Sequence, residues 1–223
     1  MEPAATVLDV TLVDLDGSLT DAAKRSGWLE DARRTVLSHH DVRQVELAPG
    51  TAFVCPGNSL GVMDSGVAFT LSRVVFPGIE ARVREAFERL GERTASGCPF
   101  LPIGRAAVVA TQHRDVFLIA APSMWTTQDV RGTRNAYHAT YAALSAASDE
   151  DRRIRRIVVP GVGTGRGMLA ADEALRQMTL AHDDFVSGRG RRYTRNEIES
   201  EQRPWPENAE FTSFVQYERY IPH

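Results

Sequence analysis

The sequence predicts an α/β protein, a three-layer α/β/α sandwich around a mixed, mostly parallel sheet. Along most of the chain, apolar runs short enough for buried strands alternate with amphipathic helical patterns. Two of the runs lead into glycine-rich turns, at residues 56–67 and 160–167, and a helical pattern follows each turn. A length of 223 residues, with 43% hydrophobic and 25% charged residues, suits one globular domain with an appendage.

The first ninety residues contain three expected strands and three expected helices. An apolar run over 5–15 predicts the first strand, and Asp16-Gly17-Ser18 predicts a turn. After the turn, Thr20 or Asp21 is expected to cap a helix that runs to Leu37, because apolar residues fall on one helical stripe. The other expected elements of this half are strands over 42–47 and 51–55 and helices over 65–74 and 79–90.

The rest of the chain continues the alternation and then changes in character. The expected elements are strands over 106–111, 116–121 and 154–159 and helices over 133–147 and 169–185. From Ser187 the composition becomes polar, arginine-rich and aromatic. We therefore expect residues 1–187 to form one domain, with an extra N-terminal βα unit, and residues 188–223 to form an irregular extension packed on it.

Charge and cysteine content exclude several functions. A net charge of −3 gives no reason to expect general nucleic-acid or membrane binding. No signal peptide or membrane-length apolar run is evident, so a cytoplasmic location is expected. Cys55 and Cys98 have no metal-site spacing, and the histidines form no metal-binding cluster. We predict no metal site and no cofactor.

The two glycine-rich turns suit phosphate groups. Glycine lets backbone N–H groups approach a ligand closely, and the start of a helix adds a partial positive charge. Because the carboxyl ends of parallel strands meet at one edge of a sheet, two such turns predict the two walls of one diphosphate cleft.

A second pattern, Asp14 to Asp21, is similar to the first motif of haloacid-dehalogenase-type phosphatases. There one aspartate attacks a phosphoryl group and a second acts as acid and base, with Mg²⁺. Those enzymes also need a distant basic residue, whereas the sole lysine, Lys24, follows the motif directly. In the alternative interpretation, Asp14 and Asp16 end an edge strand and cap the next turn.

Four segments around the glycine turns resemble the macrodomain family, which binds ADP-ribose. Residues 52–58 (AFVCPGN) resemble the family's strand that ends in an Asn-Ala-Ala-Asn-type sequence. Residues 63–67 (MDSGV) stand where the family has a Gly-Gly-Gly-Val segment, and 159–165 (VPGVGTG) resemble its second phosphate loop. Residues 120–122 (AAP) match a neighbouring strand end. The resemblance spans about 42–185 and leaves the first βα unit and the tail outside.

The resemblance implies a set of site residues. Asn58 would face the distal ribose or a water molecule, unless it is a turn asparagine that bonds its own backbone. Asp64 would act as a base or orient the water, unless it only caps the next helix. Glu46 would take the place of the family's adenine-binding aspartate. The ligand-binding residues expected with it are Gly57, Gly61, Ser65, Gly66, Val67, Pro122, Gly161, Gly163, Thr164, Gly165, Arg166 and Gly167.

The function that the resemblance implies is binding of ADP-ribose and hydrolysis of an ADP-ribosyl bond on a protein, a nucleic acid or a metabolite. The alternative is a non-catalytic ADP-ribose reader. Ala68 favours the reader, because one hydrolase subgroup carries an acidic residue there, and neither loop has the lysine of another subgroup. A nicotinamide dinucleotide is a further alternative, with Glu80 near the required distance but without the glycine fingerprint.

Overall fold

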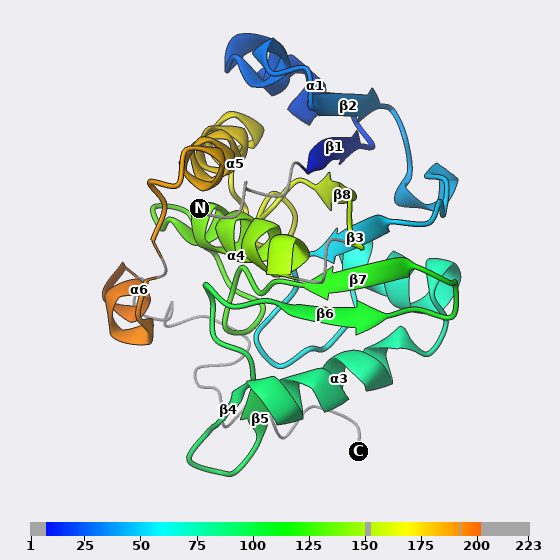
Figure 1. Cartoon of the computed structure of the whole chain (residues 1–223). Coiled ribbons are helices and arrows are strands. Elements are labelled where there is room, and N and C mark those ends of the chain that lie inside the picture. Colours follow the sequence, from blue (N-terminus) through cyan, green and yellow to red (C-terminus); the bar gives the residue numbers. More distant parts are fainter. Residues whose placement is uncertain (1–7, 150–152, 192, 202–223) are drawn as a thin grey trace, which may run out of the picture.

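The computed structural model describes residues 8–149, 153–191 and 193–201 of the chain. Its centre is a six-stranded sheet in the order β2-β1-β8-β3-β7-β6 (Figure 1). The pairs β2–β1, β1–β8, β8–β3 and β3–β7 are parallel, and β6 runs antiparallel to β7. The mixed, mostly parallel sheet of the prediction is confirmed. A short hairpin pairs β4 with β5.

The elements have the following bounds. The strands are β1 (Asp9–Asp14), β2 (Arg34–Ser38), β3 (Thr51–Cys55), β4 (Glu92–Arg93), β5 (Pro99–Phe100), β6 (Ala107–Ala110), β7 (Val116–Ala120) and β8 (Arg156–Pro160). The helices are α1 (Ser18–Arg25), α2 (Gly66–Thr70) with a π-helical continuation (Leu71–Val75), α3 (Ile79–Leu90), α4 (Asn135–Asp149), α5 (Ala171–Val186) and α6 (Arg195–Glu201).

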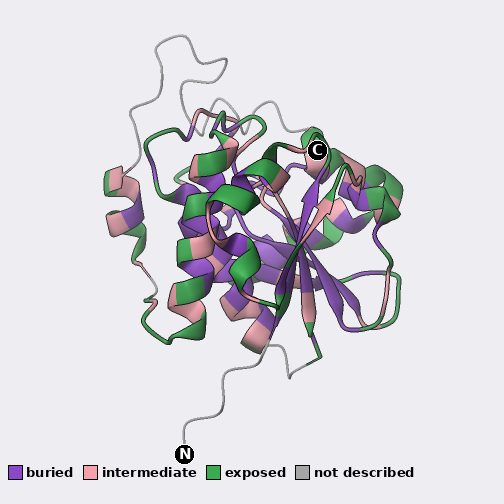
Figure 2. Ribbon diagram, turned by 90° about the horizontal axis from the view of Figure 1, so that it is seen from above, coloured by how far each residue is buried: buried purple, intermediate pink, exposed green. Residues whose placement is uncertain are grey.

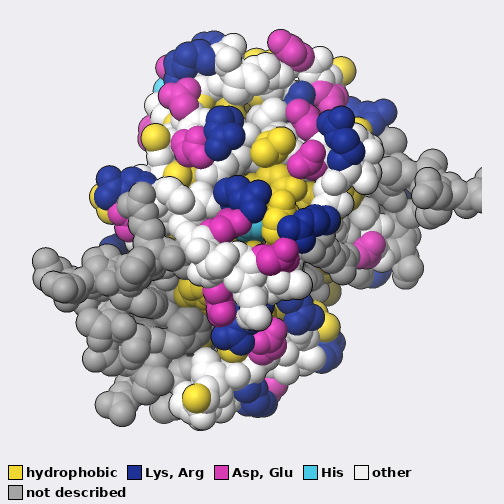
Figure 3. Space-filling view, turned by 90° about the vertical axis from the view of Figure 1, so that its left-hand side faces the viewer, with side chains coloured by type: hydrophobic (Ala, Val, Ile, Leu, Met, Phe, Trp, Pro, Cys, Tyr) yellow, Lys and Arg dark blue, Asp and Glu magenta, His cyan; other side chains and the backbone are white. Residues whose placement is uncertain are grey.

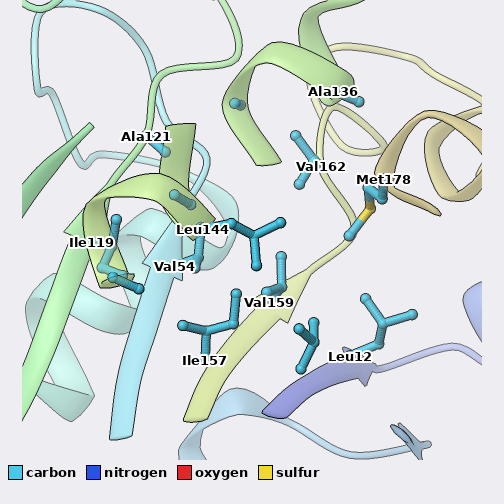
Figure 4. Packing of buried hydrophobic residues seen from close by; sticks show 14 of the residues in the cluster. Leu12, Val54, Ile119, Ala121, Ala136, Leu144, Ile157, Val159, Val162 and Met178 are labelled. Carbon is cyan, nitrogen blue, oxygen red and sulfur yellow. The ribbon is translucent and has the colours of Figure 1, made fainter. Parts of the chain in front are cut away.

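Helices cover both faces of the sheet, as expected for the sandwich. All five residues of β3 and all five of β7 are buried, because each strand has helices on both sides (Figure 2). On one face, Leu12, Val54 and Val159 pack against α1, α4 and α5 (Figure 4). On the other face, Phe53 and Leu118 pack against α2, its continuation and α3. Each face therefore has its own apolar core.

The helix expected from Thr20 or Asp21 to Leu37 is wrong in its second half. Helix α1 ends at Arg25, and Gly27 adopts a left-handed conformation with φ 72°. A 3-10 turn follows at Trp28–Glu30, and Arg34–Ser38 then forms strand β2. Pairing with β1 gives these residues main-chain hydrogen bonds on one side of the strand, so tertiary structure overrides the helical pattern.

Two further expectations need correction. Residues 42–47, expected as a strand, contain a 3-10 helix at Val42–Gln44, because Asp41 and Gln44 cap each other's backbone N–H groups in a capping box. The extension, expected to be irregular, contains helix α6 in its described part. Residues 202–223, with the tail aromatics, lie outside the described residues. None of the described helices is long and apolar enough to cross a membrane.

The stability of the domain should depend on pH near neutrality through two buried histidines, His138 on α4 and His182 on α5. Burial lowers the pKa of both below the ordinary 6.5, in His182 with a further contribution from the Arg34 charge. Because the unfolded chain then binds protons more readily than the folded chain, stability should fall as pH drops below about 6.5. Urea denaturation midpoints should be lower at about pH 5.5 than at about pH 7.5. Equal midpoints at the two pH values would contradict this pH dependence. The same fall of the midpoint in a His138→Gln/His182→Gln double variant would contradict its assignment to the two histidines.

Candidate functional site

A groove with two compartments lies where β1, β3 and β8 reach their carboxyl ends. The wide compartment has a volume of about 600 Å³, and the narrow one about 100 Å³. Gly66, Val67, Gly161 and Gly165 line both, so the compartments are continuous parts of one groove. The first glycine turn forms one wall and the second forms the other. The sequence-based expectation that the two turns face one cleft agrees with this geometry.

The second glycine turn is held in shape by its own backbone. Gly163 has φ 77°, and its carbonyl accepts the N–H of Leu169 at 3.0 Å. A Cβ on Gly167 would lie 2.6 Å from the carbonyl oxygen of Gly163, so only glycine fits there. The N–H groups of residues 165–167 donate to no acceptor within the described parts of the chain. Gly165 and Arg166 are exposed, which leaves donors at the groove available to a ligand.

The first glycine turn presents donors in the same way. Helix α2 begins at Gly66, and the side chain of Ser65 makes no capping hydrogen bond. Among the described residues, the N–H groups of residues 65–67 have no backbone or side-chain acceptor. Gly66 has φ 56°, a conformation that L side chains rarely adopt. Both walls of the groove therefore carry unused backbone donors, which is the composition of an anion-binding concavity.

Asn58 shapes the first turn instead of projecting into the groove as a free amide. Its side chain is buried, its Nδ2 donates to the carbonyl of Val62 at 3.0 Å, and its Oδ1 accepts the N–H groups of Leu60 and Val62 at 3.1 and 3.2 Å. These bonds are those of the turn-asparagine interpretation. Asn58 still lines the narrow compartment.

The wide compartment carries acidic side chains from the N-terminal part of the chain. Asp14, Asp16 and Asp41 line it together with His40. Hydrogen bonds from Ser18 lower the pKa of Asp16, and the side chain and backbone of Arg43 lower that of Asp41. Both remain carboxylates at neutral pH and act only as hydrogen-bond acceptors. Apolar side chains complete the lining, among them Val13, Leu15, Leu19, Val42 and Leu169.

Asp14 is occupied with the turn into α1. Its carboxylate accepts the N–H of Gly17 at 3.1 Å and both the N–H and the hydroxyl of Thr20 at 2.6 Å. The N-cap residue of α1 is thus Gly17 and not Thr20 or Asp21, and the Asp14 carboxylate accepts N–H groups at the start of the helix. Lys24 pairs with Asp21 and does not line the groove. This geometry supports the capping interpretation of the Asp14–Asp16 motif over the phosphatase one.

The structure brings most of the predicted site residues to the groove and leaves four outside it. Glu46 and Asp64 are exposed and line neither compartment. Gly61 and Pro122 border a void of about 10 Å³ behind the first turn. The predicted residues that line the groove are Gly57, Asn58, Ser65, Gly66, Val67, Gly161, Gly163, Thr164, Gly165, Arg166 and Gly167.

Sequence reasoning missed the wall that β1 and its following turn supply. Strand β1 lies beside β8, so Asp14 and Asp16 reach the same edge of the sheet as the second glycine turn. Their position after an apolar strand was the available signal, because the carboxyl ends of parallel strands meet. Met124 and Thr127, which line the narrow compartment, carry no such signal in the sequence.

The narrow compartment holds little that could transfer a proton. Its polar side chains are Asn58, Ser65, Thr127 and Arg166, and its lining includes no Asp, Glu, His, Cys or Lys. Cys55 lies close behind it, but burial raises the pKa of this thiol to about 12, so it stays protonated. Within the described residues, no group of His, Cys, Asp and Glu side chains is placed to hold a metal ion.

A separate cavity of about 410 Å³ lies between α3 and strands β6 and β7. It shares no lining residue with the groove. Arg82 donates to the carbonyl of Ala110 at 3.0 Å, and Arg153 lies 5.2 Å from the ring centre of Phe117. Two of the three arginines that line this cavity, Arg82 and Arg153, are therefore engaged with the domain itself.

Comparison with known proteins gives relatives by sequence and by fold. No protein-family model matches the chain. An uncharacterised protein of Aeropyrum pernix is 30% identical over 171 residues, which cover 74% of this chain and 79% of that protein. One of Aquifex aeolicus is 34% identical over 127 residues, or 56% of this chain and 68% of that protein. The chain belongs to one family with these two proteins.

Among solved structures, the macrodomain of Mycobacterium tuberculosis DarG superposes with a TM-score of 0.51 and 21% identity, over 66% of this chain and 88% of that one. Thermosipho africanus DarTG, solved in complex with ADP-ribose, gives a TM-score of 0.46 and 13% identity, over 75% of this chain and 48% of that one. The first of these likenesses shows the fold.

Proposed function

We propose that this chain, which has the macrodomain fold, binds ADP-ribose or an ADP-ribosylated molecule in its two-compartment groove. The observation that carries the proposal is the pair of glycine turns whose N–H groups, at residues 65–67 and 165–167, lack acceptors in the described structure and line one groove. A diphosphate presents acceptor oxygens and negative charge to both walls at once. Arg166, exposed at the same wall, adds a positive charge.

Charge orients the ligand within the groove. Asp14, Asp16 and Asp41 would repel a phosphate in the wide compartment, so the diphosphate belongs at the glycine turns. The acceptors and apolar side chains of the wide compartment suit a nucleoside, whose base is planar and whose amino group and hydroxyls donate hydrogen bonds. The distal ribose then lies in the narrow compartment, beside Asn58 and Thr127.

Replacing Asp41 should distinguish this arrangement from the one in which Glu46 binds the base. We expect Asp41→Ala to weaken ADP-ribose binding about tenfold, because a donor of the nucleoside loses its acceptor. Glu46→Ala should bind as the wild type does, because Glu46 is exposed outside the groove. Isothermal titration calorimetry measures both, with thermal denaturation to check folding. The reverse order of effects would restore Glu46 as the base-binding residue.

Whether the chain also cleaves an ADP-ribosyl bond depends on a base for the attacking water. The narrow compartment has no titratable carboxylate or imidazole in its lining, and this favours a reader of ADP-ribose. Asp64 directly precedes the groove-lining Ser65 and is the candidate base for the hydrolytic alternative. In that reaction, Asp64 would take a proton from water as the water attacks C1″ of the distal ribose or an ester carbonyl carbon. The bond from that carbon to its leaving group would break, and the proton would pass to the leaving group.

Turnover of an ADP-ribosylated protein, oligonucleotide or small metabolite, followed by chromatography of released ADP-ribose, separates the two functions. A reader binds these substrates and releases nothing. A hydrolase releases ADP-ribose, and Asp64→Ala should then lower kcat while leaving binding intact. Release that is unchanged in Asp64→Ala would remove Asp64 from the reaction.

We expect the groove to bind the ADP-ribosyl group, and we expect no general binding of nucleic acid. On the face shown in Figure 3, Lys and Arg side chains are interspersed with Asp and Glu side chains. Many of the described arginines are paired, for example Arg25 with Asp172 at 2.8 Å and Arg131 with Asp129 at 2.6 Å. Mixed charges of this kind give no continuous basic surface on that face.

A further inference from the structure

Helix α6 closes a third apolar cluster, separate from the cores on the two faces of the sheet. Ile198 is 1% exposed and is the fully buried side chain of this helix. Its Cδ1 lies 2.5 Å from the point that a Cβ on Gly104 would occupy, so α6 sits directly on this glycine. The buried members of the cluster are Leu60, Val62, Phe100, Ile103, Trp125 and Ile198.

Three other members of this cluster belong to segments that build the narrow compartment. Leu60 and Val62 lie in the first glycine turn, and Trp125 lies in the segment after β7. Val62 lines the narrow compartment, as does Met124, the neighbour of Trp125. The cluster therefore lies directly behind the groove wall.

Hydrogen bonds join these segments to one another at Ser59. The Ser59 N–H donates to the carbonyl of Met124 at 2.9 Å, and its hydroxyl donates to the same carbonyl at 3.2 Å. The carbonyl of Ser59 accepts the N–H of Leu101 at 2.9 Å. Ser59 thus links the first glycine turn directly to the segment after β7 and to Leu101.

Polar contacts fasten α6 at both ends. At its start, Arg195 lies 5.2 and 5.9 Å from the ring centres of Phe100 and Trp125 and pairs with Glu92 at 2.9 Å. At its end, Glu201 accepts hydrogen bonds from Arg134 and from His138, the latter at 3.1 Å. In Figure 1, α6 lies near the N-terminal part of α4. His138 belongs to this part of α4, and Arg134 directly precedes the helix. The helix bridges the start of α4 and the cluster behind the groove.

We propose that α6 is a positioning element for the groove, with Ile198 and Arg195 as the residues that hold the first glycine turn and the segment after β7 in their ligand-binding conformation. A seven-residue helix with one fully buried side chain can detach at a low free-energy cost, without unfolding the sheet. Its detachment exposes Leu60, Val62 and Trp125 and loosens the narrow compartment. The effect on ligand affinity rests on the proposed ADP-ribose binding, whereas the effect on the segments does not.

Hydrogen exchange of the ligand-free protein tests the structural half of this inference. Ile198→Asp should speed the exchange of amides in 58–63 and 123–128 about tenfold, with the amides of β3 and β8 unchanged. Asn196→Asp places the same charge on an exposed position of α6 and should exchange as the wild type does. Ile198→Leu should restore slow exchange. Unchanged exchange in both segments, or equal acceleration throughout the sheet, would overturn the inference.

Calorimetry with ADP-ribose on the same variants tests the functional half. Ile198→Asp and Arg195→Ala should weaken binding about tenfold, and Asn196→Asp and Ile198→Leu should bind as the wild type does. Wild-type affinity in Ile198→Asp would overturn the positioning role. If the wild type itself binds no ADP-ribose, the proposed function fails, and the exchange experiment alone then decides whether α6 holds these segments.

Discussion

Gly165→Glu is expected to weaken ADP-ribose binding severely and to leave the domain as stable as the wild type. A Cβ at this position meets no atom within 4 Å, and Gly165 lines both compartments of the groove. The new side chain therefore extends into the groove without disturbing the second turn. Its carboxylate would lie beside the diphosphate, and juxtaposed like charges cost several kcal/mol. We expect affinity in calorimetry to fall by about 100-fold or more.

Two control variants test whether the loss of affinity comes from a negative charge at the second glycine turn. Gly165→Ala adds a methyl group in the same open space and keeps the backbone donors, so it should bind within about threefold of the wild type. Gln112→Glu adds the same charge at an exposed position outside the groove and should have no effect on binding. If Gly165→Glu bound ADP-ribose like the wild type, the diphosphate would not lie at the second glycine turn.

Phe53→Ala is expected to cost about 3–5 kcal/mol of stability, the usual range for a buried phenylalanine. Phe53 is fully buried on β3, the strand between β8 and β7 that leads into the first glycine turn. Its ring meets that of Phe76 edge to face, with 5.3 Å between the ring centres. Removing it leaves a cavity under the π-helical continuation of α2, which packs on the same core.

Urea denaturation measures this cost, and Phe69→Ala is the matched control. Phe69 lies on α2 with 46% of its surface exposed, so its removal should change stability by less than about 1 kcal/mol. Equal costs for the two variants would show that the core does not have the packing described around β3.

The parts of the fold that could be predicted are those whose local pattern and tertiary environment agree. Strand β3 and helix α3 have the predicted bounds, because a fully apolar run suits a strand covered on both faces and because Gly91 caps the helix. Residues 34–37 were expected to be helical, and only the pairing of Arg34–Ser38 with β1 makes this segment a strand. A partner strand distant in the sequence leaves no trace in the local periodicity.

The residues of the candidate site also fall into two groups: those that a local sequence pattern predicts and those that only the tertiary structure brings to the groove. Glycine turns could be found from the sequence because the backbone itself requires glycine, through a left-handed conformation at Gly163 and through a close approach to the Gly163 carbonyl at Gly167. Side chains such as Asp41 enter the groove through the order of the strands and the capping box before β3, which a linear pattern does not reveal. The role of Asn58 was stated as two alternatives, and its three hydrogen bonds within the turn favour the structural one.

The most direct test of the central claim is a titration of the ¹⁵N-labelled wild-type protein with ADP-ribose, followed by amide chemical shifts. We predict saturable shifts at one-to-one stoichiometry that are largest at residues 65–67 and 165–167, whose N–H groups line the groove without a partner among the described residues. The absence of saturable shifts, or shifts confined to the cavity around Arg82 and Phe117, would contradict binding of ADP-ribose at the glycine turns.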